Sequence, residues 1–394
     1  MKIREVTIEG IGGINNITLN LDPELNIICG PNGIGKSTIL EAISFVFNRF
    51  SNNKIKKNIV SETGRVTLSI FNGEEKFSLT SLVKSSEPKD NEYSPHKGID
   101  PKKMIKFDTK RHFEYQKLAT LNADSVRSEH DINAQIMNGV IITDIKEWLA
   151  KRHLFSKVDD GYSKNTLKNV ELAKKSISSL NENYFFSRVN PKTYDIFVKT
   201  PNGEIWYEYL SSGFKSCISL LIGLIKEIEI RFSEEDDLAV DFNGLILIDE
   251  LELHLHPEWQ SRITEVLTMT FPKAQFIVST HSPHVVQNAK PNQIITLERS
   301  DDGHTQVRES LGVTTGYTGW TIDEVLRDVM GMESTLSRKL QQKLNEFYDL
   351  IDSEDYVKAS EAYSYLDKIL HPRNVLRKSL SMSLDLIKDS AEDA

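Results

Sequence analysis

The sequence of 394 residues has only two cysteines, Cys29 and Cys217, which excludes a disulfide scaffold and a four-cysteine zinc site. Long hydrophobic runs are also missing: none approaches the ~20 residues that cross a bilayer, so no membrane segment is predicted. The first ten residues alternate like a strand and lack the apolar core of a signal peptide. With few cysteines, these features favour a cytoplasmic protein.

Basic residues are fewer than acidic ones: 48 Lys and Arg against 57 Asp and Glu give a net charge of −9. This balance argues against a globally basic nucleic-acid binder and leaves room for a local basic groove. Hydrophobic residues make up 39% and charged residues 27%, as in ordinary globular proteins. The length suggests two domains, or one large domain with insertions.

Alternating and helical hydrophobic patterns divide the chain into elements. Strands are predicted at Ile3–Ile8, Ile17–Leu21, Leu25–Cys29, Arg65–Phe71, Lys76–Val83, Tyr194–Thr200, Ile205–Tyr209, Leu245–Ile248, Gln275–Thr280 and Gln293–Glu298. Helices are predicted from Gly35 to Phe47 and from Gly213 to about Ile230. The polar stretch Ser85–Lys103 is interpreted as a surface loop, and Asp301-Asp302-Gly303 as a hairpin turn.

Two regions have a mainly helical pattern. Residues from about 129 to 187 form a predicted helical insertion, in which Lys151-Arg152-His153 and Lys174-Lys175 are interpreted as solvated helix faces, with a DNA-facing surface as the alternative. Residues 309–394 form an acidic tail with 10 Lys and Arg against 16 Asp and Glu. A stripe in this tail is more typical of an internal core than of an interface: Leu336, Leu340, Leu344, Phe347 and Leu350.

Residues 30–37, GPNGIGKS, match the phosphate-binding pattern G-x-x-x-x-G-K-[ST] between a strand and a helix. Glycines let backbone N–H groups curl around phosphate oxygens, and the helix N-terminus favours negative charge. Lys36 is expected to reach the β- and γ-phosphates, and the Ser37 hydroxyl to ligate Mg²⁺. We therefore predict ATP binding by Asn32, Gly33, Ile34, Gly35, Lys36, Ser37 and Thr38.

A second acidic motif follows the apolar run Leu245–Ile248. Asp249, at the carboxyl end of a buried strand, is expected to lie beside the phosphate loop and hold Mg²⁺ directly or through water. Glu250 is the candidate general base that polarises the attacking water. A bare surface turn is the alternative.

Together with these motifs, two further segments give the chain a resemblance to ABC-type ATPases, closest to the Rad50/SMC-like branch of ATPase heads. Leu210-Ser211-Ser212-Gly213 resembles the family's LSGGQ signature, with Ser212 in place of the first glycine and Phe214-Lys215 in place of the glutamine. Ser279-Thr280-His281-Ser282 resembles its switch-histidine motif. The resemblance implies an α/β head with a mixed sheet around the phosphate loop, an antiparallel N-terminal β subdomain, a helical insertion and a helical C-terminal tail.

The resemblance implies an ATPase domain over residues 1–308 and a tail at 309–394 for oligomerisation or partner docking. It implies a head-to-tail dimer, in which Ser211, Ser212 and Gly213 of one chain meet ATP held by the other, while His281 senses the γ-phosphate. A metal site at His254, His256, His281 and His284 is a weaker alternative. The altered signature makes slow turnover plausible, and Gln116 is the candidate for the family's Q-loop glutamine.

The string DELELHLHP at residues 249–257, with Gly12-Gly13-Ile14 and residues 319–323, narrows the resemblance to bacterial anti-phage ATPases, the PtuA-like Septu and retron-associated proteins. This implies a homodimer or higher homo-oligomer that controls a separate HNH-type nuclease or other effector, with DNA contacted through the complex. We find no coiled-coil heptads, Toprim pattern or HNH constellation in the sequence itself. The alternative functions are a Rad50/SMC-like repair head that binds DNA directly and, last, a transport ATPase.

Overall fold

A computed structural model describes residues 1–392 except 53, 74, 95–97, 110–116, 125, 143, 160 and 309–314. Its contacts divide the chain into two compact units, Met1–Gly331 and Met332–Ala394. Gln116 lies outside the described residues. In the described part, no helix is long and apolar enough to cross a membrane.

The centre of the first unit is a six-stranded sheet built mainly from short apolar strands. Its order is β15 (Thr305–Val307), β14 (Ile294–Arg299), β3 (Leu25–Cys29), β13 (Gln275–Ser279), β12 (Leu245–Ile248) and β8 (Met104–Phe107). All neighbours are parallel except β14 and β15, which form the predicted hairpin around Asp301-Asp302-Gly303. Buried runs of this kind are typical of parallel strands covered on both faces.

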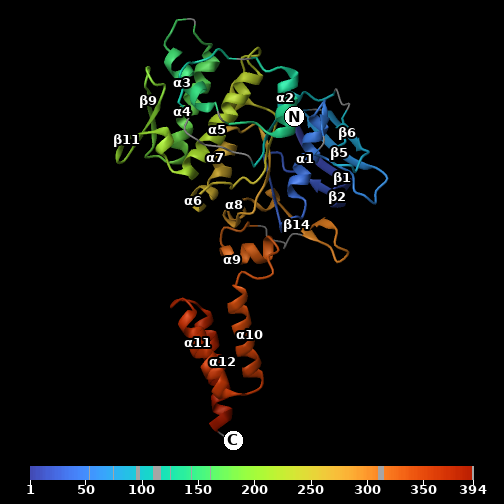
Figure 1. The fold of residues 1–394 in the computed structure, drawn as a ribbon, viewed down its shortest axis with the longest axis vertical. Coiled ribbons are helices and arrows are strands. Elements are labelled where there is room, and N and C mark those ends of the chain that lie inside the picture. Colours follow the sequence, from blue (N-terminus) through green and yellow to red (C-terminus); the bar gives the residue numbers. More distant parts are fainter. Residues whose placement is uncertain are drawn as a thin grey trace. The chain divides into compact units, whose positions relative to one another are not determined.

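Both faces of this sheet are covered, because successive strand residues point to opposite sides. On β12, Ile246 and Ile248 enter one hydrophobic core, and Leu245 and Leu247 enter the other. The first core is closed by helices α3 (Ile145–Phe155), α4 (Lys164–Leu180), α5 (Ser212–Arg231) and α7 (Ile263–Thr270). The second is closed by α1 (Lys36–Phe47), α2 (Glu129–Asn138) and an antiparallel sheet. Figure 1 shows α3, α4 and α5 on one side of the unit and the antiparallel sheet on the other.

The antiparallel sheet has the order β2 (Ile14–Asn20), β1 (Lys2–Ile11), β5 (Gly64–Asn72) and β6 (Glu75–Val83). A third sheet has the order β11 (Gly203–Trp206), β10 (Ile196–Thr200) and β9 (Phe185–Val189). β7 (Glu92–Tyr93), inside the predicted surface loop, pairs with β4 (Ser51–Asn52). Three short helices complete the unit: α6 (Pro257–Gln260), α8 (Pro283–Gln287) and α9 (Ile322–Glu324). The predicted architecture, a mixed sheet around the phosphate loop with an antiparallel N-terminal sheet, is confirmed.

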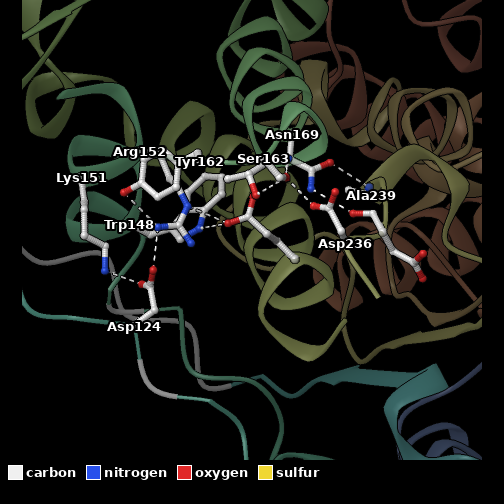
Figure 2. Close-up of polar contacts among 12 residues, drawn as sticks. Asp124, Trp148, Lys151, Arg152, Tyr162, Ser163, Asn169, Asp236 and Ala239 are labelled. Carbon is white, nitrogen blue, oxygen red and sulfur yellow. Dashed lines mark hydrogen bonds and ion pairs between the residues drawn. The ribbon is translucent and has the colours of Figure 1, made fainter. Parts of the chain in front are cut away.

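One interpretation of the sequence was wrong. Lys151 and Arg152 are not on a solvated helix face, since they are only 9% and 6% exposed. The Arg152 guanidinium pairs with Asp124 at 2.6 Å, as Figure 2 shows. It also pairs with the buried Glu229 carboxylate at 2.8 Å. The pattern of charges could not reveal this because the partners are 28 and 77 residues away. The pair with Glu229 joins α3 of the helical insertion to α5.

The second unit consists of α10 (Arg338–Asp352), α11 (Tyr356–Ile369) and α12 (Leu376–Glu392). Its core includes Leu344 and Phe347, against which Leu340 and Leu350 pack. This confirms the core interpretation of the tail stripe for those four residues. Leu336 lies outside it and is 37% exposed.

Candidate functional site

The sheet brings three loops of the candidate site to one edge. Strands β3, β12 and β13 are adjacent and parallel, so their carboxyl ends meet there. The phosphate loop follows Cys29, Asp249 follows Ile248, and Thr280-His281 follows Ser279. Open parallel sheets generally bind ligands at this edge. Segments more than 200 residues apart in sequence are therefore neighbours in space.

The phosphate loop has the backbone that its glycines permit. Gly30, Gly33 and Gly35 have positive φ angles of 141°, 71° and 107°. A Cβ on Gly30 would lie 2.4 Å from the Leu297 carbonyl oxygen of the next strand, so a side chain there is excluded by sterics as well. Helix α1 begins directly after Gly35 and directs its N-terminus at the loop.

Lys36 lies across this loop and is 6% exposed. Its ammonium donates hydrogen bonds to the carbonyl oxygens of Gly30 and Pro31, both at 2.9 Å. Burial lowers the pKa of Lys36, and this is opposed by the nearby Glu252, Asp249 and Glu250 carboxylates. The lysine is thus held inside the loop, where a phosphate would offer it a fully charged acceptor.

The Ser37 hydroxyl and the Asp249 carboxylate meet beside the loop, with Ser37 Oγ 3.1 Å from Asp249 Oδ1. Magnesium binds oxygen ligands at 2.0–2.1 Å in octahedral geometry, so two adjacent ligands are about 3 Å apart. The donor types and their separation therefore fit Mg²⁺. Among the described residues, no group of three or more His, Cys, Asp and Glu could hold a metal ion, so the alternative four-histidine site has no support.

Ser279 positions both acidic residues. Its hydroxyl donates to Asp249 Oδ1 at 2.5 Å and accepts from the Glu250 backbone N–H at 2.8 Å, while the side chain is 1% exposed. Glu250 has φ of 47°, a left-handed conformation that is uncommon for a residue with a side chain. The hydrogen bond from its N–H helps to hold this turn. Sequence reasoning missed this role, although Ser279 belongs to the motif that it singled out.

Replacing Ser279 with alanine removes both hydrogen bonds and leaves a buried carboxylate oxygen less well solvated. We expect the free energy of unfolding to fall by about 1–3 kcal/mol and the hydrolysis rate to fall at least about fivefold, with a smaller change in ATP affinity. Chemical denaturation and steady-state kinetics measure these quantities. Ser176→Ala is the matched control, because Ser176 of α4 is also buried and its hydroxyl donates to a carbonyl oxygen, that of Leu172 in the preceding turn of the same helix. Equal kinetic losses in both variants would contradict the assignment.

Glu252 holds the loop that carries His281. The Glu252 carboxylate accepts from the Thr280 hydroxyl at 2.6 Å and from the His281 backbone N–H at 2.5 Å. Burial, followed by the positive charge of Lys36, lowers the pKa of His281. The imidazole therefore favours its neutral form at neutral pH. The sequence analysis did not predict Glu252 as a residue of the site. Its position two residues after Glu250 could have indicated this role.

A buried ion network supports the loop from the other side. Lys106 of β8, 1% exposed, pairs with Glu41 of α1 at 2.5 Å and with Asp108 at 3.2 Å. Asp108 also pairs with Lys54 at 2.9 Å. Although burial acts to raise it, these two lysines hold the pKa of Asp108 below its usual value. Glu41 is one helical turn beyond Ser37, so the network ties the end of β8 to the helix of the phosphate loop.

The signature segment is placed elsewhere. Ser211 caps α5, its hydroxyl accepting from the Phe214 N–H at 3.4 Å, and both Ser211 and Ser212 are exposed. Gly213 packs against the turn after the acidic motif, where a Cβ would lie 2.9 Å from the His256 backbone nitrogen. Among the described residues, no hydrogen bond or ion pair joins Leu210–Gly213 to the phosphate loop.

Comparisons with known proteins agree with this arrangement. Residues 25–287 match the family model described as "AAA domain, putative AbiEii toxin, Type IV TA system". The Septu protein PtuA of Bacillus thuringiensis is 42% identical over 385 residues, which cover 97% of each chain. The chain belongs to the PtuA family of AAA-domain ATPases. It is therefore an ATPase, as predicted, of a Septu-type defence system.

More distant similarities cover less of this chain. A retron Ec83 probable ATPase of Escherichia coli is 27% identical to this PtuA family member over 52% of its chain and 36% of the retron protein. Among solved structures, an SMC head domain from Thermotoga maritima is 18% identical with a TM-score of 0.46, covering 79% of this chain and 99% of that domain.

Proposed function

We propose that this ATPase binds ATP with Mg²⁺ between two copies of the chain and thereby controls a separate effector of an anti-phage defence complex. The observation that carries the proposal is the separation of its two phosphate-binding elements. Lys36 and Ser37 lie at one sheet edge, whereas the exposed Ser211 and Ser212 at the start of α5 make no hydrogen bond or ion pair to the phosphate loop among the residues that the structure describes. When one copy supplies Lys36 and Ser37 and a second copy supplies Ser211 and Ser212, both elements bind the same ATP molecule.

Each group has a task that follows from its place. Lys36 and the glycine loop bind the β- and γ-phosphates, while Ser37 and Asp249 would hold Mg²⁺, which neutralises phosphate charge when bound. Glu250 orients and deprotonates the attacking water. His281, neutral and fixed by Glu252 through its backbone, lies near Lys36 as a sensor of the γ-phosphate.

Control of the effector follows from differential binding. ATP would contact Lys36 of one copy and Ser211 of the other only when the copies are closed on each other. A ligand that binds one conformation better shifts the population toward it. Hydrolysis removes the γ-phosphate contacts and releases the closed state. We propose that the second unit, residues 332–394, docks the effector or further copies and responds to this change.

A mixing experiment tests the shared site. Neither Lys36→Ala nor Ser211→Arg protein should hydrolyse ATP alone, because every site in each homodimer is defective. In a mixture, a heterodimer contains one site with both Lys36 and Ser211 intact. We expect up to about a quarter of wild-type activity for random pairing with independent sites. The readout is phosphate release, with the mass of the assembly measured with and without ATP.

The control mixes Lys36→Ala protein with protein that carries both Lys36→Ala and Lys273→Ala, the second change being at an exposed lysine of the first unit. Every site in this mixture lacks Lys36, so no activity should return. If the Lys36 and Ser211 variants are folded and exchange subunits yet restore no activity, ATP is not held between copies.

A further inference from the structure

The sheet β9–β10–β11 has an outer face unlike the rest of the surface. Ile196 and Val198 of β10 point into the core, at 1% and 0% exposure, so the alternate residues of this strand point outward. In register with them are outward residues of both neighbouring strands. We define the aromatic face as Phe185, Arg188, Phe197, Lys199, Trp206 and Tyr209. Figure 1 shows β9 and β11 at the margin of the unit, near α4.

Four of these side chains form a continuous row. The Arg188 guanidinium lies 3.9 Å from the centroid of the Phe197 ring. The Phe197 and Trp206 rings are 5.3 Å apart, and the Trp206 and Tyr209 rings are 5.4 Å apart. These distances are those of cation–π and aromatic pairs. Contacts between neighbouring side chains therefore hold the row in place, with ring faces on which a planar ligand can stack.

The aromatic face is accessible to solvent on both sides of Phe197, which is itself only 9% exposed. Trp206 is 42% exposed, Phe185 49% and Tyr209 73%. Isolated exposed apolar residues are ordinary, but a group of large aromatic side chains on one face indicates a binding surface.

The charges around these rings select the ligand. Arg188, Lys199 and the exposed Lys192 in the turn between β9 and β10 accompany two carboxylates, Glu204 and Asp195, of which Asp195 accepts a hydrogen bond from Trp206. Both carboxylates are compensated, since Glu204 accepts from Arg188 at 2.7 Å and from the Ser187 hydroxyl at 2.6 Å, and Asp195 pairs with Lys146 at 2.7 Å. A local positive surplus on a protein of net charge −9 favours a polyanion and disfavours a second copy of the same face.

We propose that the aromatic face binds single-stranded nucleic acid, with bases stacked on Trp206 and Tyr209 and phosphates facing Lys199 and Arg188. Stacking on aromatic side chains beside a basic track is how proteins bind single strands with little sequence preference. In a duplex the base faces are hidden, so a single strand binds better. The face ends two residues before Ser211, which places the bound strand beside the proposed ATP site.

Fluorescence anisotropy with the full chain and fluorescein-labelled oligo(dT) of about 20 nucleotides, longer than one stacking site, tests this proposal. Trp206→Ala with Tyr209→Ala should weaken binding at least about tenfold at constant salt, because stacking contributes roughly 5- to 150-fold per base. Trp206→Phe keeps a stacking surface and should retain most of the affinity. Lys199→Gln should reduce the slope of log affinity against log salt by about 0.7.

The matched control is Tyr93→Ala, which removes an aromatic side chain of 58% exposure from β7. It should bind oligo(dT) like the wild type, and a duplex of equal length should bind more weakly than the single strand. Undetectable binding by the wild type, equal affinity in the double variant, or an equal loss in Tyr93→Ala would each overturn the proposal. A face that serves a protein partner instead gives the first of these results. Because no hydrolysis is measured, failure here is separate from failure of the shared ATP site.

Discussion

Replacing Lys36 with alanine is expected to weaken ATP binding by roughly 100-fold or more. The side chain is buried in the phosphate loop, where its ammonium bonds the Gly30 and Pro31 carbonyl oxygens. When a triphosphate enters, this is the cation inside the loop that meets its charge. Removing one partner of a buried charge pair generally costs about 2–5 kcal/mol, which corresponds to this loss of affinity.

Isothermal titration with ATP and Mg²⁺ measures the effect. Lys273→Ala is the control, because this lysine is exposed and pairs with Asp241 instead. Circular dichroism should show that both variants are folded. Unchanged nucleotide affinity in folded Lys36→Ala protein would show that the phosphates bind elsewhere.

Replacing Glu250 with glutamine is expected to reduce hydrolysis by about 10²- to 10⁴-fold while ATP still binds. Glutamine keeps the size and the backbone hydrogen bond to Ser279, but it cannot take a proton from water. The variant should therefore accumulate in the ATP-bound, closed assembly. Removing a negative charge near Lys36 also leaves phosphate binding no weaker.

Single-turnover hydrolysis and the assembly mass in ATP measure these two consequences. Glu258→Gln, an exposed glutamate in the first turn of α6, serves as the control and should behave like the wild type. A Glu250→Gln protein with wild-type single-turnover rates would remove Glu250 from the role of base.

Local patterns were sufficient to predict four strands of the main sheet, β3, β12, β13 and β14, and the loops of the candidate site. The buried strands β3, β12 and β13 were predicted with the observed first residues. Each is a short apolar run that is followed by a clear boundary: the glycine loop, the two acidic residues or the polar histidine motif. Parallel pairing then brings their carboxyl ends together. The catalytic and binding roles of the residues at that edge remain predictions.

Long-range pairing is what the sequence did not reveal. The strand β8 was missed because Lys106 interrupts its apolar pattern, and this lysine is stable there only through Glu41 and Asp108. Arg152 is compensated in the same way by Asp124 and Glu229. A charge in the sequence looks solvent-exposed until its distant partners are known.

The close packing of Gly213 on the turn at His256 has a consequence for cooperativity. A methyl group placed on Gly213 would lie 2.9 Å from the His256 nitrogen, so the start of α5 and this turn cannot shift independently. The turn follows the acidic residues of a copy's own site, whereas the start of α5 is the part proposed to serve its neighbour. In the proposed dimer, hydrolysis at one nucleotide would therefore alter the surface that this copy presents to the other, and the two sites are expected to hydrolyse ATP in a correlated order.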